Sequence, residues 1–318
     1  YEIPLRLVGS EMCIRDRTVY IATDGNGVHF LSHKDQQVTR RFYHDVNDKE
    51  GIRSNSIYSL LVDDRGAVWV GHFQAGLDYS LYQNGLFRTY DYPPLFNSAN
   101  LSIRSFVNKG QEKVIGSRDG LFYINEATGV VKSFVKPIST SDLILTISFY
   151  QGEYYIGTYG GGMMVLNPET LSLKYFAQGD TELFQKGHIF CVKPDAKGNL
   201  WIGTSQGLFS YNGQTKQIKS FTSANSQLPE GNVYEVSFDS TGKGWIATET
   251  GMCIYDPASQ SLRSNVFPEG FVNKDKVRTI YEDAGHNLYF IREKGSLFTS
   301  TLTMDRFQNR SIFSPLPD

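Results

Sequence analysis

The sequence predicts an all-β protein, namely a seven-bladed β-propeller of four-stranded antiparallel blades. The first observation is a pattern of about 45 residues that recurs seven times and fills nearly the whole chain. The second is composition, because 14% of the 318 residues are aromatic and 30 are glycine, which is typical of many short strands and tight turns. In addition, no segment shows a convincing helical apolar period. Repeats of this length most simply form the blades of a propeller.

The clearest copy of the repeat spans residues 189–211. It consists of the run Ile-Phe-Cys-Val, the turn Asp-Ala-Lys-Gly, the run Leu-Trp-Ile-Gly-Thr and the run Gly-Leu-Phe-Ser-Tyr. We call the small residue of the second run the anchor. It is glycine or alanine in six copies, which predicts a crowded position beside another backbone. The anchors are Ala22, Gly71, Gly116, Gly157, Gly203, Ala247 and, departing from the rule, Ile291.

Each copy predicts four strands in a constant order. Strand one is the apolar run 11–14 residues before the anchor, as at 277–280, and strand two contains the anchor. Strand three follows the second glycine, as at 120–124, and strand four lies 14–19 residues after the anchor, as at 171–176 and 217–221. Recurring aspartates and glycines mark the turn between strands one and two, where they are expected to cap the turn and to adopt positive φ. They are Asp63, Asp195, Asp239 and Asp283, and Gly66, Gly152, Gly198 and Gly242.

Composition and motifs exclude several classes of protein. The 31 Lys and Arg against 33 Asp and Glu leave no broad positive field for nucleic acid. No apolar run approaches the ~20 residues that cross a bilayer, and no secretory signal is visible, so membrane insertion by this segment is not expected. The three cysteines have no CxxC spacing, and we predict no catalytic residue, no metal and no cofactor. Cys191 and Cys253 are expected to be free, buried and inert.

The run at 195–209, with Asp-x-x-Gly, Leu-Trp-Ile-Gly-Thr and Gly-Leu-Phe, resembles the two-component regulator propeller repeat. The resemblance covers residues 18 to about 310 and is strongest at 57–79, 189–211 and 233–256. It implies a periplasmic sensor module that binds an oligosaccharide or other small ligand and has no catalytic activity of its own. The parent protein would be a hybrid two-component histidine kinase anchored in the inner membrane.

The same resemblance implies a domain organisation. Family members usually carry two propellers, a β-sandwich, a membrane helix and a kinase, so residues 18–318 are expected to be one propeller from a larger sensor. Further propeller and sandwich domains of the parent chain, and a second parent copy in a homodimer, are the implied partners. Residues 1–17 lie outside the repeat, and 7–17 resemble translated read-through of a sequencing adapter. On that interpretation the segment is not native and the first blade is incomplete, because it lacks its inner strand.

The candidate ligand site lies in the loops where the copies disagree, because a residue repeated in every copy serves the scaffold. In propellers, the loops between strands two and three and the loops that join blades usually emerge on one face. Aromatic rings there could stack on sugars, while Arg, His and carboxylate groups could hold hydroxyls or uronates. The candidates are His72, Gln74, Arg118, Asp119, Tyr159, Gln206, Glu249, Arg292 and Glu293 from the first loop type, and His188 from the second.

One position of strand one carries unexpected charge. Arg104 and Arg278 occupy it where other copies have Tyr58, Leu145, Phe190 and Tyr234. Charge there needs partners or water, so a wet or anion-lined channel is a hypothesis. Two other functions remain open. A propeller lyase, acting on a polysaccharide or resembling streptogramin lyase, would need a His or carboxylate cluster assembled from several blades. A protein-interaction scaffold would need an exposed apolar face.

Overall fold

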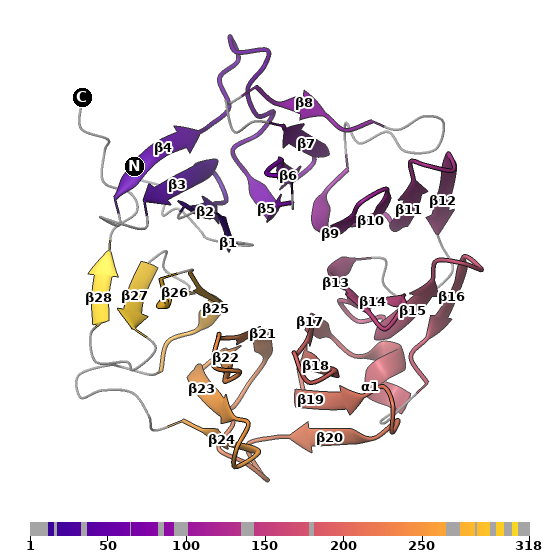
Figure 1. The fold of residues 1–318 in the computed structure, drawn as a ribbon, viewed down its shortest axis with the longest axis vertical. Coiled ribbons are helices and arrows are strands. Elements are labelled where there is room, and N and C mark those ends of the chain that lie inside the picture. The colour runs from indigo at the N-terminus through magenta and orange to yellow at the C-terminus, as the bar shows by residue number, and fades with distance from the viewer. Residues whose placement is uncertain are drawn as a thin grey trace. The chain divides into compact units, whose positions relative to one another are not determined.

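The structure is a computed structural model. It describes residues 12–15, 18–32, 37–63, 65–81, 86–91, 101–134, 143–177, 181–264, 274–283, 285–292, 297–301 and 307–310. Within these residues the chain forms seven sheets of four strands, and inside each sheet every strand is hydrogen-bonded to the next one in sequence. This is the seven-bladed β-propeller that the repeat predicts (Figure 1).

Each blade contains four consecutive strands. Blade 1 consists of β1 (Met12–Arg15), β2 (Thr18–Ala22), β3 (Val28–Ser32) and β4 (Val38–Phe42). Blade 2 consists of β5 (Ile57–Val62), β6 (Val68–His72), β7 (Leu77–Ser80) and β8 (Arg88–Thr89). Blade 3 consists of β9 (Ile103–Lys109), β10 (Glu112–Ser117), β11 (Leu121–Asn125) and β12 (Val130–Phe134). Blade 4 consists of β13 (Ile144–Tyr150), β14 (Glu153–Thr158), β15 (Met163–Asn167) and β16 (Ser172–Tyr175).

The remaining three blades follow the same order. Blade 5 consists of β17 (Ile189–Pro194), β18 (Asn199–Thr204), β19 (Gly207–Asn212) and β20 (Ile218–Phe221). Blade 6 consists of β21 (Val233–Phe238), β22 (Gly244–Thr248), β23 (Gly251–Asp256) and β24 (Ser261–Arg263). Blade 7 consists of β25 (Val277–Glu282), β26 (Asn287–Arg292), β27 (Leu297–Thr301) and β28 (Phe307–Arg310).

The chain divides into two compact units. Unit 1 comprises residues 1–104 and 281–318, and unit 2 comprises residues 105–280. Blades 1 and 2 lie in unit 1, blades 4, 5 and 6 lie in unit 2, and the boundaries fall inside β9 and β25. Each unit has its own apolar clusters, and burial is greatest in strands two and three and smallest in strand four. Because the inner parts of a blade are covered on both faces, their strands are continuous apolar runs.

The small anchors lie where the next blade packs against strand two. A Cβ on Gly203 would be 2.5 Å from the Sγ of Cys191 and 2.8 Å from the carbonyl oxygen of Val233, the first residue of β21. A Cβ on Gly157 would be 2.6 Å from Cγ2 of Ile189, the first residue of β17. The crowding that the sequence predicts is therefore confirmed. The exception, Ile291, is fully buried in an apolar cluster of unit 1.

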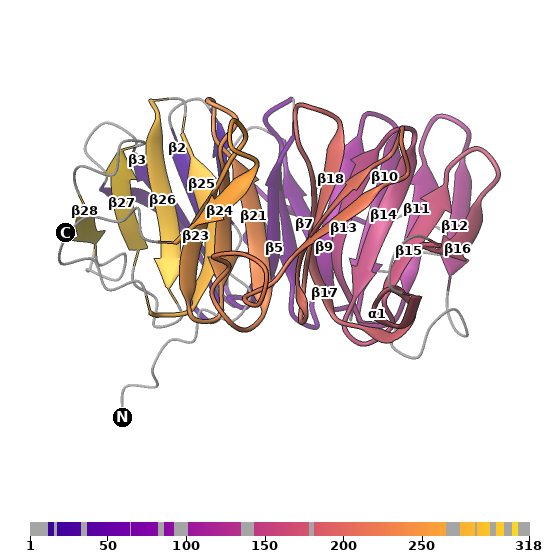
Figure 2. The same ribbon diagram turned by 90° about the horizontal axis from the view of Figure 1, so that it is seen from below.

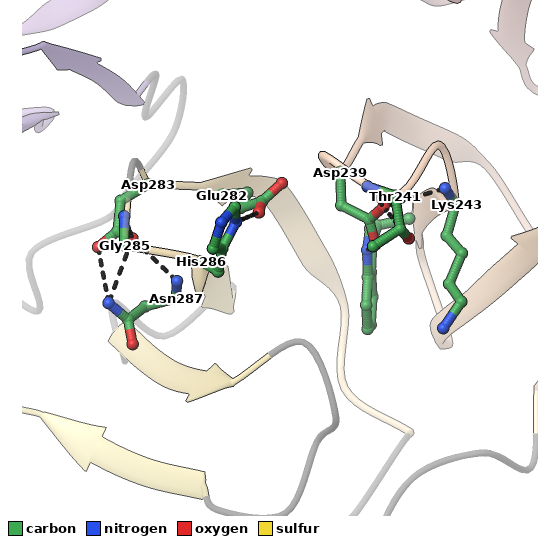
Figure 3. A network of polar contacts seen from close by, with 9 residues as sticks. Asp239, Thr241, Lys243, Glu282, Asp283, Gly285, His286 and Asn287 are labelled. Carbon is green, nitrogen blue, oxygen red and sulfur yellow. Dashed lines mark hydrogen bonds and ion pairs between the residues drawn. The ribbon is translucent and has the colours of Figure 1, made fainter.

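The aspartates of the first turn cap it, as predicted. Asp239 Oδ1 accepts hydrogen bonds from the backbone N–H groups of Thr241 and Lys243, at 2.9 and 3.0 Å. Its second oxygen accepts a hydrogen bond from Nε1 of Trp245 at 2.8 Å. Figure 3 shows this turn and the corresponding turn of blade 7, where Asp283 accepts from the N–H groups of Gly285 and Asn287. The predicted turn glycines have positive φ, as in Gly242 at 82°.

Two expectations need correction. The first blade is not short of a strand, because β1 is paired in antiparallel register with β2. In addition, a short helix that the sequence does not predict, α1 (Thr181–Lys186), lies in unit 2 at the edge from which β17 starts (Figure 2). Its Leu183 and Phe184 are buried in the same apolar cluster as Tyr211 of blade 5. Six residues are fewer than two helical turns, so they produce no recognisable period.

The described residues contain no helix with the length and apolar character that a membrane span requires.

Candidate functional site

The candidate site of unit 2 begins with two of the predicted residues. Tyr159 follows β14 and His188 precedes β17, and the two form an isolated antiparallel β-bridge. Their rings lie 4.1 Å apart between centroids, with an angle of 31° between the planes. Tyr159 keeps 49% of its surface exposed, so this ring is accessible to a ligand. The structure thus brings together a residue from each of the two loop types that the sequence analysis selected.

Two further aromatic residues continue the arrangement along the inner strands. The ring centroid of Phe190 in β17 lies 6.2 Å from that of His188 and 5.2 Å from that of Tyr234 in β21. Figure 1 shows β17 and β21 as neighbouring inner strands of unit 2. Both rings are partly exposed. We call the four residues Tyr159, His188, Phe190 and Tyr234 the aromatic strip.

Polar and charged groups surround the Tyr234 end of the aromatic strip. The guanidinium carbon of Arg278 lies 4.6 Å from the Tyr234 ring centroid, and Nζ of Lys276 lies 5.0 Å from it. Asn232 donates from Nδ2 to the Tyr234 hydroxyl at 3.1 Å, and Glu249 Oε2 accepts from the Asn232 backbone N–H at 3.3 Å. The predicted candidate Glu249 therefore lies in the same network. Cations within about 6 Å of a ring centroid are attracted by its face.

Unit 1 contains a smaller cluster of the same kind. The ring of Tyr58 in β5 lies 5.1 Å from the ring of Phe73 and 4.4 Å from the guanidinium carbon of Arg104 in β9. Gln74, a predicted candidate, is exposed beside this cluster, and its backbone N–H donates to the Ser102 hydroxyl at 3.2 Å. We call Tyr58, Phe73 and Arg104 the Tyr58 cluster. Burial is the main cause of a raised Tyr58 pKa.

One predicted candidate lies in the core instead of on an exposed loop. His72 is the last residue of β6 and has no exposed surface, and its Nε2 is 2.9 Å from Asp78 Oδ2. Asp78 also accepts from Nε and the backbone N–H of Arg53, at 2.7 and 3.1 Å. The anchor is followed by Thr or Ser in five other copies, and a hydroxyl there bonds within the turn. His72 instead hydrogen-bonds to Asp78, which also accepts hydrogen bonds from Arg53. Because His72 has no exposed surface, the prediction that it contacts a ligand is wrong.

Four other candidates, all among the described residues, do not join either cluster. Arg118 and Asp119 are exposed in the turn between β10 and β11, and Gln206 is exposed between β18 and β19. Arg292 is partly exposed, with its guanidinium carbon 4.3 Å from the ring centroid of Phe298. Glu293 lies outside the described residues.

The sequence analysis did not select Phe190, Tyr234 or Lys276 as ligand contacts. Phe190 and Tyr234 follow the first residue of strand one, where a large side chain recurs in the copies. A large side chain that recurs at one position of the repeat is expected to serve the scaffold. Both side chains are nevertheless partly exposed, whereas the adjacent Ile189 and Val233 are fully buried. Lys276 precedes β25 and carries no sequence signal of its own.

The two described cysteines lie in blades 5 and 6. Burial raises the pKa of the Cys191 and Cys253 thiols, and both cysteines are free and buried, as predicted. Within the described part of the chain, no three His, Cys, Asp or Glu side chains are placed to hold a metal ion. Partial burial raises the pKa of Glu235 in β21, although Lys193 Nζ lies 3.4 Å from its carboxylate and opposes the shift.

Seven four-stranded blades define a repeat protein of the propeller class. Two segments, residues 51–74 and 184–206, match the family model described as the two component regulator propeller, which confirms the resemblance found in the sequence. No match was found among proteins with curated descriptions.

Three solved structures share the fold. The extracellular domain of a hybrid two component system from B. thetaiotaomicron is 22% identical to this chain, with a TM-score of 0.73. The match covers 94% of this chain and 39% of that domain's chain. A second such domain from that organism is 16% identical with a TM-score of 0.72, covering 94% and 38%. An ancestral GH74 enzyme is 13% identical with a TM-score of 0.69, covering 98% and 47%. The chain thus spans less than half the length of each of these structures.

Proposed function

We propose that this chain is the extracellular, ligand-sensing propeller of a hybrid two-component system and that its ligand is an oligosaccharide. The sensor role is supported by the matching family segments and by the two similar extracellular domains. Signalling then requires only that the ligand binds one arrangement of the parent protein more tightly than another.

The aromatic strip is the observation that carries the ligand class. Its ring centroids are separated by 4.1 to 6.2 Å, and its first member is half exposed. Aromatic rings offer apolar faces to sugars, and the neighbouring Arg278, Lys276 and Glu249 offer polar contacts to hydroxyl or acidic groups. The proposed binding surface therefore combines ring faces with hydrogen-bonding groups within unit 2.

Calorimetric titration with a panel of neutral and acidic oligosaccharides tests the proposal. For a sugar that binds, Tyr159→Ala and Phe190→Ala are each expected to weaken binding about fivefold, because one aromatic contact contributes on the order of 1 kcal/mol. Tyr175→Ala is the matched control, since Tyr175 is an exposed tyrosine on the outer strand β16. Equal losses in all three variants, or no binding to any sugar, would contradict the proposal. Turnover of a sugar during the titration would favour the lyase instead.

A further inference from the structure

A basic residue recurs on the outer strands of the blades. It lies at one register position of strand four, opposite the residue two positions after the first apolar residue of strand three, and it is exposed in each case. Exposed charge on an outer strand discourages edge-to-edge pairing of sheets, so the recurrence by itself points to no ligand. The residues are Arg40, Arg88, Lys132, Lys174, Lys219 and Arg263.

Two of these residues, Lys219 of β20 and Arg263 of β24, line one cavity, which we call the rim groove. Its walls come from β20, the segment that follows it, and β24 with the turn before it, and all of them belong to unit 2 (Figure 1). Its apolar part is formed by Phe221 and Leu262, which are buried. The volume of about 660 Å³ is in the range of small-molecule sites. No residue of the aromatic strip lines the rim groove.

Hydrogen bonds between the two walls hold the rim groove in shape. Lys219 Nζ donates to the carbonyl oxygen of Gln260 in the turn before β24, at 3.2 Å. The backbone N–H of Ser264, directly after β24, donates to Oε1 of Gln227 at 3.2 Å. Because packing and these bonds already fix the walls, a ligand that enters the groove has little ordering to perform.

The rim groove is positively charged, because the described residues that line it include Lys219 and Arg263 and no acidic residue. The bond to Gln260 uses one of the three N–H groups of the Lys219 ammonium, which also lies 4.8 Å from the ring centroid of Phe221. One terminal nitrogen of Arg263 lies 3.3 Å from Oδ2 of Asp256, in an ion pair that leaves 53% of the arginine side chain exposed. A pair this exposed contributes little, and the guanidinium carries five N–H groups in all. Both cations can therefore add a bond to a ligand without giving up their present partners.

We propose that the rim groove is a second saccharide site, which takes an oligosaccharide bearing a carboxylate or a sulfate. This inference rests on the proposed function and extends it to the outer edge of unit 2. Lys219 and Arg263 hold the acidic group, because charged donors form the strongest hydrogen bonds to such oxygens. Exposed hydroxyl and amide groups that line the same groove contact the sugar hydroxyls, namely those of Ser220, Gln227 and Gln260.

The experiment is a calorimetric titration in which the two cations are neutralised one at a time. The probes are a uronate trimer and a sulfated disaccharide, each compared with its neutral counterpart and with inorganic sulfate. We expect the acidic sugars to bind at least about tenfold more tightly than either comparison, and added salt to weaken their binding. Lys219→Gln and Arg263→Gln are each expected to weaken it about tenfold, because a charge-assisted hydrogen bond to the acidic group is lost. Both side chains are exposed, so both variants are expected to fold.

Matched controls come from the same register position of two other blades. Lys132→Gln and Lys174→Gln remove exposed lysines of β12 and β16 that are not among the residues lining the rim groove, and they should leave binding unchanged. Equal weakening in all four variants would mean that diffuse positive charge attracts the sugar and that the groove does not bind it. Equal affinity for the neutral sugars, or for inorganic sulfate, overturns the class of ligand.

Phe190→Ala separates this inference from the proposed function. If it weakens sugar binding while Lys219→Gln and Arg263→Gln do not, the rim groove is excluded and the aromatic strip stands. If the two groove variants weaken binding of the acidic probes while Phe190→Ala changes nothing, the groove stands and the strip is excluded. No binding of any probe overturns both proposals.

Discussion

His29 of blade 1 is a buried histidine whose pKa is lowered by its surroundings. It lies in β3 with no exposed surface, and its Nε2 is 3.1 Å from the carbonyl oxygen of Asn26. Burial, followed by the charge of Arg41, lowers its pKa from 6.5 to about 4. The corresponding position in other copies holds Phe122, Met164, Phe209 or Cys253, so His29 behaves as a neutral core residue.

Acid should therefore destabilise the protein through His29. The unfolded chain binds a proton on this histidine below about pH 6.5, whereas the folded chain does so only below about pH 4, so stability is lost as the pH falls through that window. The loss is on the order of 3 kcal/mol from this residue. Urea unfolding at pH 7 and at pH 4 measures it, and His29→Phe should flatten the difference. An equal pH dependence in the variant would show that other groups cause it.

At the scale of the element, an aspartate stabilises the turn between strands one and two in four of the blades. In blade 5, Asp195 accepts from the backbone N–H groups of Lys197 and Asn199 and from Nε1 of Trp201, all within 2.9 Å. In blade 7 the hydroxyl of Tyr289 takes the place of the indole, at 2.9 Å from Asp283. One carboxylate thus caps the turn and also holds the large ring of strand two six residues later.

Asp195→Ala should lower the free energy of unfolding by about 3 kcal/mol, because it leaves several donors, including the buried indole of Trp201, without an acceptor. Urea denaturation of the variant measures the loss. Lys197→Ala is the control from the same turn, since this side chain is exposed, and it should change stability by less than about 0.5 kcal/mol. Similar values for the two variants would mean that the cap does not stabilise the blade.

At the scale of the whole molecule, the seven blades fall into two compact units, and each unit carries one tyrosine–arginine pair. Within the chain itself, a ligand that binds only the folded state must stabilise it in proportion to occupancy. This gives a test of ligand binding that needs only this chain.

An oligosaccharide that binds the aromatic strip should raise the Tm of the chain. At a concentration one hundred times Kd the expected stabilisation is about 2.7 kcal/mol for one site. Thermal unfolding at increasing ligand concentration measures the effect. The shift should shrink in Phe190→Ala and persist in Tyr175→Ala. A shift of equal size in both variants would place the ligand elsewhere.

The amino-acid sequence by itself determined the number of blades, the order of the strands and the main features of their turns. The reason is that these are local properties. The crowded anchor position needs a small residue, a turn needs Asp and Gly, and a buried strand needs apolar residues. Each of these requirements therefore leaves a signal that recurs along the sequence. The repeat period located strand four at 171–176, and β16 runs over Ser172–Tyr175. Helix α1 left no such signal because it occurs once and is short.

Only the tertiary structure decided which side chains meet. Tyr159 and His188 were selected from their loops, and their rings do lie in contact. Phe190 and Tyr234 meet because β17 and β21 lie side by side, although more than 40 residues separate these two rings in the sequence. His72 was selected by the same loop rule, yet Asp78 and Arg53 hold it in the core. Exposure and ring contact depend on neighbouring blades, so they have no signature within one repeat.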